Sequence, residues 1–217
     1  METKILLGVP CLDTMKTETV ASIFSATAML EYPARLHIQK SCYVHDARNK
    51  IVSGAIEKGF SHIMFVDSDM QFPPDSINRL VKLDKDVVGG VYFRRQIPHL
   101  PTINSLENDK IVVPYKFPKD QPFKIWAVAT GFMLIKIEVV KKIPYPWFGF
   151  GSYKGQSMGE DVYFCRKVND HNFQVWADPT IPIGHVGEYN YTVRDFDAYQ
   201  DIRKKENVPD EFNGEMK

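Results

Sequence analysis

Hydrophobic and polar positions along the first ninety residues predict strands and helices in alternation. Short apolar runs closed by Pro or Gly are typical of buried strands, whereas apolar residues three and four apart indicate one face of a helix. The expected elements are a strand over 4–9 closed by Pro10, a helix from 17 to before Pro33, a strand over 36–43, a helix from an Asp46 N-cap to Gly59, a strand over 62–66, a helix opened by Pro73-Pro74, and a strand beginning at Val87.

This order predicts an α/β fold, in which a mostly parallel central sheet is flanked by helices in a single domain. The second half is less regular. It is expected to contain two strands within 124–137 separated by a glycine break, a loop over 143–157 that is a candidate lid, a helix over 159–169 and a strand over 174–177. We expect the domain to cover 1–194 and a polar C-terminal tail to cover 195–217.

Composition argues against some classes of function and indicates a cellular compartment. The 217 residues include 27 Lys and Arg against 27 Asp and Glu, so the formal net charge is zero, and this argues against a protein that coats nucleic acid. No apolar run approaches the roughly 20 residues of a membrane span. The N-terminus does not resemble a signal peptide, and the three scattered cysteines favour a reducing compartment, so we expect a cytoplasmic protein.

The clearest candidate chemistry follows the 62–66 strand, where Asp67-Ser68-Asp69 begins. Ligands bind at the carboxyl ends of strands in open α/β sheets, and in extended backbone residues two apart point the same way. Two carboxylates facing one pocket repel each other unless a cation lies beside them, which predicts a Mg²⁺ or Mn²⁺ site. The alternative is that these aspartates only end the strand as a turn or cap.

Two further features lie later in the chain. Glu160 and Asp161 stand at the start of the 159–169 helix, where they could act in catalysis or simply favour the helix N-terminus electrostatically. His185 lies between Gly184 and Gly187, so it could approach a ligand closely or be an ordinary hydrogen-bonded histidine.

Taken in order, these stretches resemble the GT-A glycosyltransferases, within them the family 2-like branch that uses nucleotide sugars. The stretches that carry the resemblance are 6–10 (Leu-Leu-Gly-Val-Pro), 65–70 (Phe-Val-Asp-Ser-Asp-Met), 130–135 (Thr-Gly-Phe-Met-Leu-Ile), 159–165 (Gly-Glu-Asp-Val-Tyr-Phe-Cys) and 184–187 (Gly-His-Val-Gly). The resemblance implies a GT-A, Rossmann-like fold and a metal-dependent sugar transfer.

The resemblance also implies roles for single residues. Asp69 and His185 would bind Mn²⁺ or Mg²⁺, and Asp67 would hold the ribose or reach the metal through water. Asp161 would be the catalytic base, with Glu160 as the alternative. In this reaction charge develops on the departing diphosphate, and a carboxylate removes the proton of the acceptor hydroxyl.

Further residues would bind the nucleotide sugar. They are Pro10, Cys11 and Leu12 beside the nucleobase, and Arg48, Asp67, Ser68 and Arg94. Arg48 could instead be a surface charge on a helix. Tyr92, Arg94 and Arg95 could contact the donor sugar or form a surface turn, and Trp126 and Trp147 could stack on sugars or be buried.

The expected partners are a UDP- or GDP-sugar type donor and a hydroxyl acceptor such as a glycan, with no nucleic acid and no transmembrane segment. Two other functions remain open. A nucleotidyltransferase also uses carboxylates and a metal, but the loop after the first strand has no Lys or Arg over 8–13. A non-catalytic module that binds a nucleotide sugar or glycan would keep Asp69 and His185 without turnover. The chain could also be one domain of a larger protein.

Overall fold

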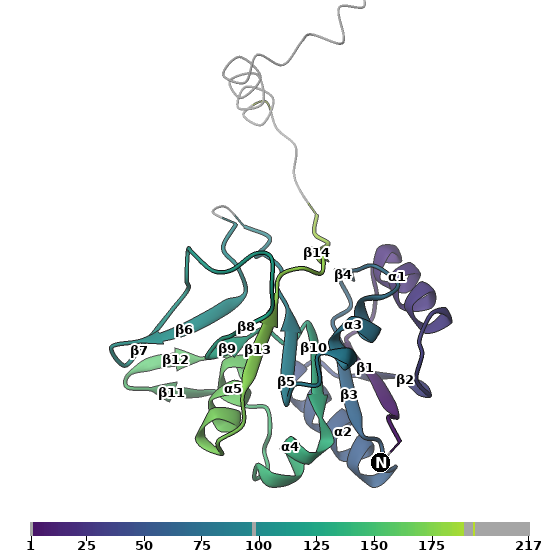
Figure 1. The fold of residues 1–217 in the computed structure, drawn as a ribbon, viewed down its shortest axis with the longest axis horizontal. Helices are drawn as coiled ribbons and strands as arrows, with labels where there is room; N and C mark the ends of the chain where they lie inside the picture. Colours follow the sequence, from purple (N-terminus) through teal and green to yellow (C-terminus); the bar gives the residue numbers. More distant parts are fainter. Residues whose placement is uncertain (1, 97–98, 189–192, 194–217) are drawn as a thin grey trace, which may run out of the picture. The chain divides into compact units, whose positions relative to one another are not determined.

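The computed structural model describes residues 2–96, 99–188 and 193. A seven-stranded sheet runs through its centre in the order β2-β1-β3-β10-β5-β13-β8 (Figure 1). Its strands are β1 (Ile5–Cys11), β2 (Ala34–Lys40), β3 (His62–Val66), β5 (Val87–Gly90), β8 (Phe123–Lys124), β10 (Phe132–Lys136) and β13 (Val175–Asp178). All except β8 and β10 run in one direction, so the expected mostly parallel α/β sheet is confirmed.

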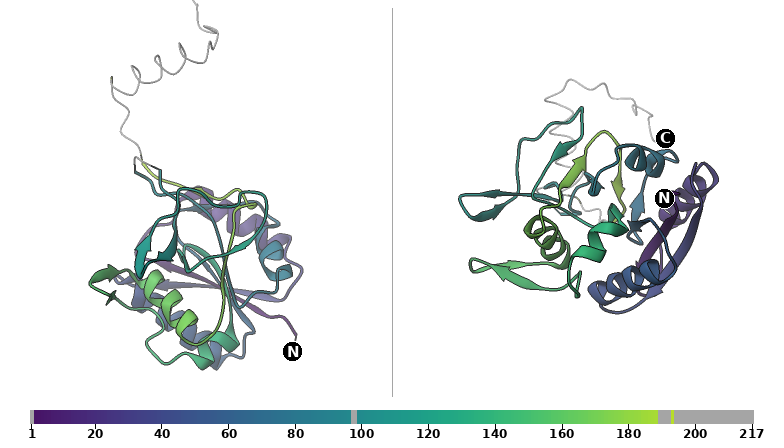
Figure 2. Two further views of the ribbon diagram at one scale, coloured as in Figure 1. Left: turned by 60° about the vertical axis from the view of Figure 1, so that its left-hand side comes forward. Right: turned by 60° about the horizontal axis from the view of Figure 1, so that its bottom comes forward.

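Helices cover both faces of this sheet (Figure 2). One face packs against α1 (Thr17–Ala28) and α3 (Ser76–Lys82), and the other against α2 (Val44–Glu57), α4 (Ile137–Lys142) and α5 (Glu160–Asp170). The side chains of β3 alternate between two hydrophobic clusters, with Ile63 and Phe65 on the α2 face and Met64 and Val66 on the α1 face. A strand buried on both faces is apolar throughout, which is why the 62–66 run predicted β3 with its exact bounds.

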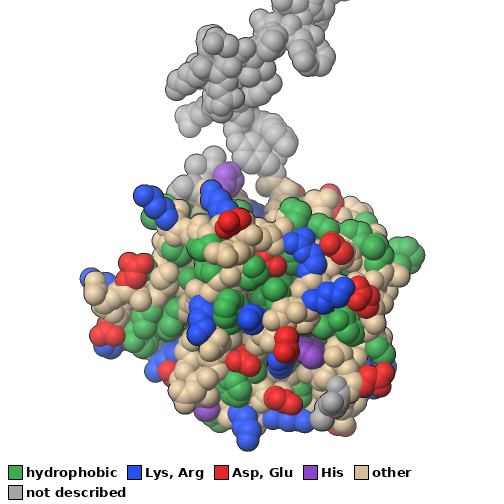
Figure 3. Space-filling view, viewed as in Figure 1, with side chains coloured by type: hydrophobic (Ala, Val, Ile, Leu, Met, Phe, Trp, Pro, Cys, Tyr) green, Lys and Arg blue, Asp and Glu red, His purple; other side chains and the backbone are tan. Residues whose placement is uncertain are grey.

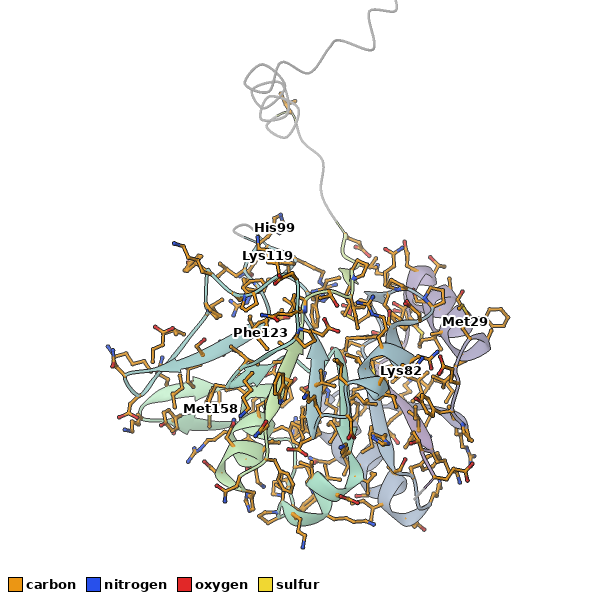
Figure 4. The ribbon with its side chains drawn as sticks, in the orientation of Figure 1. Met29, Lys82, His99, Lys119, Phe123 and Met158 are labelled. Carbon is orange, nitrogen blue, oxygen red and sulfur yellow. The ribbon has the colours of Figure 1, made fainter. Side chains whose placement is uncertain are left out.

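Smaller strand pairs are added to this core. A three-stranded sheet contains β6 (Ile103–Glu107), β7 (Lys110–Val112) and β9 (Ala127–Val128), a hairpin joins β11 (Gly151–Tyr153) to β12 (Gln156–Met158), and β4 (Met70–Gln71) pairs with β14 (Gly184–His185). The Gln156 side chain bonds to the Ile111 backbone in both directions, which ties the hairpin to β7. Met158, labelled in Figure 4, ends β12 just before α5.

Several expected boundaries were wrong. The helix expected from Asp46 begins at Val44, so Asp46 lies in its first turn and forms an ion pair with Lys50. The first strand continues through Pro10 to Cys11, because these two residues pair only with β2 and not with β3. The segment 143–157 is not one loop, since it includes β11 and part of β12, and β6 and β7 were missed.

The described residues up to Val186 form one compact unit. The tail expected over 195–217 lies outside the described residues, so the boundary after 194 stays a prediction. In the part of the chain that is described, no helix is both long and apolar enough to span a membrane.

Candidate functional site

The turn after β3 separates the two aspartates of the Asp67-Ser68-Asp69 segment. The Asp67 amide still donates to the Gly131 carbonyl at 2.9 Å, but Ser68 and Asp69 form a turn that leads into β4. The expected extended backbone over these residues is therefore wrong. Each aspartate has different cationic partners.

Asp67 is held by Arg48, which projects from the first half of α2. The Nη2 of Arg48 donates to both oxygens of Asp67, at 2.8 and 3.1 Å, and its Nη1 donates to Glu160 at the start of α5. The Arg48 side chain is only 3% exposed, and its Nε has no hydrogen-bond partner among the described residues. Burial alone would lower the pKa of Arg48, but Asp67 and Glu160 raise it more, so this guanidinium stays charged.

Asp69 contacts a different pair of side chains. Its Oδ2 lies 3.0 Å from Nη1 of Arg95 and 3.5 Å from Nε2 of His185. The Nδ1 of His185 lies 3.0 Å from the Phe93 carbonyl oxygen, which can only accept a proton, so Nδ1 is the protonated nitrogen. In the neutral ring Nε2 then presents its lone pair toward Asp69.

Local backbone pairing explains why His185 reaches this turn. β14 pairs with β4 so that His185 lies opposite Met70, and the Val186 amide donates to the Asp69 carbonyl at 2.8 Å. Burial tends to raise the pKa of Asp69, but the contact with His185 lowers it below its usual value, and the same contact raises the pKa of His185. The structure therefore brings together the predicted metal-binding pair Asp69 and His185.

A polar cavity of about 310 Å³ lies beside the start of α5. Its lining includes Asp161 together with Arg94, Thr102, Asn104 and Ser157. Burial, and next the charge of Glu160, raise the pKa of Asp161 above its usual value. Asp161 thus differs from Glu160, whose carboxylate is paired with Arg48.

A buried tyrosine, Tyr92, and a glycine, Gly131, pack beside the turn that follows β3. The Gly131 amide donates to the Tyr92 hydroxyl at 3.1 Å, and the Tyr92 ring meets the His185 ring edge-on at 5.2 Å. A Cβ added at Gly131 would lie 2.4 Å from the Tyr92 hydroxyl oxygen and 2.9 Å from Oδ2 of Asp67. The sequence predicted a glycine break within 124–137 and placed Gly131 in a stretch that carries the family resemblance, but it assigned Gly131 no role in the site.

The remaining predicted site residues lie at the same edge of the sheet. Pro10, Cys11 and Leu12 end β1 and begin the next loop, and the Lys16 amide in that loop donates to the Ser68 carbonyl at 2.9 Å. Arg94 lies on the loop after β5 that also carries His99, labelled in Figure 4. Trp147 instead donates from Nε1 to the Val140 carbonyl, and it packs against the core of the α2 face.

The Asp69 carboxylate and the His185 imidazole are both suitable ligand types for a divalent ion. A carboxylate and an imidazole with a free Nε2 suit Mn²⁺, and a metal-binding histidine often donates its other N–H to a carbonyl, as His185 does to Phe93. Within residues 2–96, 99–188 and 193, no group of three or more His, Cys, Asp and Glu side chains is placed to hold an ion. Asp69 and His185 are thus a pair of donors and not a complete set of metal ligands.

Comparison with known proteins gives the fold and little else. No family model and no curated protein matches the chain. The crystal structure of A197 from STIV superposes with a TM-score of 0.62 at 17% identity, over 86% of this chain and 87% of that one. At this identity the likeness supports a shared fold alone.

Weaker likenesses involve proteins whose names mention nucleotide sugars. A UDP-glucose pyrophosphorylase from Acinetobacter baumanii gives a TM-score of 0.49 at 8% identity, over 85% of this chain and 88% of that one. A putative nucleotide-diphospho-sugar transferase from Desulfovibrio desulfuricans G20 gives 0.42 at 10% identity, over 82% and 80%. At TM-scores below 0.5 these two likenesses carry no weight.

Proposed function

We propose that this protein is a metal-dependent glycosyltransferase that moves a sugar from a nucleotide-diphosphate sugar to a hydroxyl group of an acceptor such as a glycan. The observation that carries the proposal is the approach of Asp69 Oδ2 and His185 Nε2 to 3.5 Å, with the His185 Nδ1 proton committed to the Phe93 carbonyl. When His185 is neutral, two electron-pair donors face each other there at the carboxyl edge of the sheet, where α/β folds bind ligands.

Asp69 and His185 would hold Mn²⁺ or Mg²⁺ at this edge. The bound ion would neutralise the negative charge that develops on the departing diphosphate. Asp67 is a weaker candidate ligand because Arg48 already donates to both of its oxygens. It would act on the ribose or through water, and Ser68 and the loop over 10–12 would contact the nucleotide.

Asp161 suits the role of catalytic base better than Glu160. A catalytic base needs a carboxylate that is not held in an ion pair and whose pKa is close to the working pH. Where the surroundings of two neighbouring carboxyl groups push their pKa values apart, the group with the raised pKa is the one suited to exchange protons. The pKa of Asp161 is raised, the residue lines the cavity, and its Oδ1 accepts a hydrogen bond from the Val162 amide and, among the described residues, from no side chain, whereas Glu160 is bound to Arg48. The acceptor hydroxyl would enter this cavity beside Arg94.

Arg48 acts through other residues in this proposal. Its guanidinium is buried beneath the site and joins α2, the β3 turn and the start of α5 through Asp67 and Glu160. We therefore assign Arg48 the positioning of these two carboxylates in place of direct contact with the nucleotide.

The test is a thermal-shift panel of nucleotide sugars with and without Mn²⁺, followed by product analysis with the best ligand. A ligand that binds only the native state raises the melting temperature according to its affinity. We expect one or more nucleotide sugars to stabilise the protein only with Mn²⁺ and to release a nucleoside diphosphate when an acceptor is added. A panel without any shift would refute the proposal. Pyrophosphate chemistry would identify a nucleotidyltransferase, and binding without turnover would identify a binding module.

A further inference from the structure

The cation beside Asp69 is held in a different way from the cation beside Asp67. The Arg48 side chain is 3% exposed and donates to both oxygens of Asp67. The Arg95 side chain is 46% exposed, and its Nη1 lies 3.0 Å from Oδ2 of Asp69. An exposed ion pair contributes little free energy, because water solvates both of its groups when they separate. The contact between Arg95 and Asp69 can therefore open at low cost.

One oxygen of Asp69 has two partners. Oδ2 lies 3.0 Å from Nη1 of Arg95 and 3.5 Å from Nε2 of His185. The same Nη1 donates to the carbonyl of Val186, the residue after His185, at 3.0 Å. Under the proposed function this oxygen and Nε2 would bind a divalent ion, whose two positive charges would lie next to the guanidinium. Like charges repel, so Arg95 competes with the ion for Asp69.

The backbone that carries Arg95 is closed by hydrogen bonds just before this residue. The Arg94 amide donates to the Leu100 carbonyl at 2.9 Å, and the Thr102 amide donates to the Tyr92 carbonyl at 2.9 Å. Exposed side chains change rotamer within nanoseconds. Arg95 can therefore release its carboxylate by rotating its side chain, while the closed backbone stays in place.

The released guanidinium would have a new partner of opposite charge. In the proposed reaction the diphosphate of the donor lies at the ion held by Asp69 and His185, and it carries several negative charges. A guanidinium pairs with phosphate oxygens through two parallel hydrogen bonds. On the face shown in Figure 3, positive and negative side chains are interspersed, so the described residues of this face form no broad positive surface. The diphosphate would therefore depend on cations placed at the site itself.

We propose that Arg95 is an exchangeable counter-ion that couples metal binding to diphosphate binding. Arg95 neutralises Asp69 before ligands bind, leaves this carboxylate when a divalent ion binds there, and then pairs with the diphosphate. This inference rests on the proposed function and adds to it a coupling between the two ligands. The bound metal frees Arg95 for the diphosphate, and the bound diphosphate keeps Arg95 away from Asp69, so each ligand strengthens the binding of the other.

The first test is the binding of Mn²⁺ alone, measured by the EPR signal of the free ion. Arg95→Gln removes the competing cation, so we expect it to bind Mn²⁺ about 5–150-fold more tightly than the wild type, the usual range of coupling between two sites. Arg95→Lys keeps a positive charge and should stay closer to the wild type. Arg166→Gln is the matched control, because Arg166 is also a solvent-accessible arginine that pairs with an aspartate and donates to a backbone carbonyl. It should leave the affinity for Mn²⁺ unchanged.

The second test is the binding of UDP and GDP at saturating Mn²⁺, measured by titration calorimetry. Here Arg95→Gln lacks a partner for the diphosphate, so we expect it to bind the nucleotide about 5-fold or more weakly than the wild type. The two effects have opposite signs, whereas a purely structural role of Arg95 would weaken the binding of both ligands.

The outcomes separate this inference from the proposed function. If Arg95→Gln matches the wild type in its affinity for Mn²⁺ or for the nucleotide, the exchange is refuted while the proposed function stands. If the wild type binds Mn²⁺ in neither experiment, the exchange and the metal dependence of the proposed function are refuted together.

Discussion

Asp67 and Asp69 belong to one turn, yet their surroundings differ mainly in the cation beside them. Arg48 is buried and donates to both Asp67 and Glu160, so it links three elements of the fold. Arg95, the cation beside Asp69, is 46% exposed, and the second partner of Asp69 is the imidazole of His185. A buried guanidinium is held mainly by its carboxylates, whereas exposed ion pairs contribute little to stability.

This difference predicts that Arg48 mainly affects the stability of the fold, whereas Asp69 mainly affects ligand binding. Removing the buried cation leaves carboxylates without a counter-charge in a partly dry environment, so the cost falls on the fold. Changing Asp69 releases an exposed arginine that water can solvate, so the cost falls on whatever ligand Asp69 and His185 bind. A change at Arg48 should therefore lower stability more than ligand binding, and a change at Asp69 should lower ligand binding more than stability.

The largest effect is expected for Arg48→Met. It leaves Asp67 and Glu160 unpaired, and breaking a buried ion pair from one side costs about 3–5 kcal/mol of unfolding free energy. Denaturant unfolding measures the loss. Arg48→Lys should lose less, because it keeps the charge but not the forked geometry. Lys50→Met, an exposed position on the same helix, is the control and should change stability by less than about 1 kcal/mol. Equal losses of unfolding free energy for Lys50→Met and Arg48→Met would contradict the idea that the buried Arg48 stabilises the fold more than an exposed ion pair does.

Asp161→Asn tests the proposed base. Sugar transfer should fall by about 10²–10⁴-fold while Mn²⁺-dependent nucleotide binding persists, and initial rates together with thermal shifts measure the two effects. Equal loss of both would make Asp161 a structural residue.

The same variant has a pH signature. Because burial raises the pKa of Asp161 in the folded state, its ionisation destabilises the fold, and stability present at acid pH is lost as the pH rises through this raised pKa. Asp161→Asn does not ionise, so its melting temperature should fall less than that of the wild type between acid and neutral pH. Parallel pH profiles would contradict this reading.

Gly131→Ala tests the support behind the turn. The new Cβ would lie 2.4 Å from the Tyr92 hydroxyl oxygen and 2.9 Å from Oδ2 of Asp67, so these side chains must shift, at a cost of about 1–3 kcal/mol. Gly54→Ala in α2 is the matched control, because a Cβ there meets nothing within 4 Å and alanine favours a helix. We expect the first variant to melt earlier than the wild type and the second to melt at the same temperature or later.

The smallest effect on stability is expected for Asp69→Ala. Loss of its exposed partner Arg95 should change the unfolding free energy by less than about 1 kcal/mol, while Mn²⁺-dependent stabilisation by nucleotide sugars disappears. Asp170→Ala, which removes an exposed pair with Arg166, should keep the Mn²⁺ response. If Asp69→Ala also keeps that response, the metal assignment is wrong.

Much of the fold could be predicted because burial leaves a direct mark on the sequence. β3 is apolar at every position since both of its faces are covered, and its bounds were predicted without error. β6 and β7 were missed because only Ile103 of their residues is buried, so their pattern carries little signal. Asp46 was predicted as a cap from its residue type, but the helix begins at Val44, where no side chain caps it.

The candidate site shows the same limit. The sequence offered five candidate site residues, Asp67, Asp69, Glu160, Asp161 and His185. They could be recognised by their residue types and by their places beside strands and helices. Their partners could not, because Arg48 with Glu160 and His185 with Asp69 are contacts between residues more than a hundred positions apart.

The sequence by itself determined the α/β class, the central strands and the set of acidic residues at one edge of the sheet, since local periodicity records which faces are buried. Only the tertiary structure decided which aspartate is held by Arg48, which one meets His185, and which acidic residue lines the cavity. It also decided that β2 ends the sheet and stays exposed. These outcomes depend on strand order and on the turn at Ser68, where the direction of a side chain is set by distant pairing and not by its neighbours in the chain.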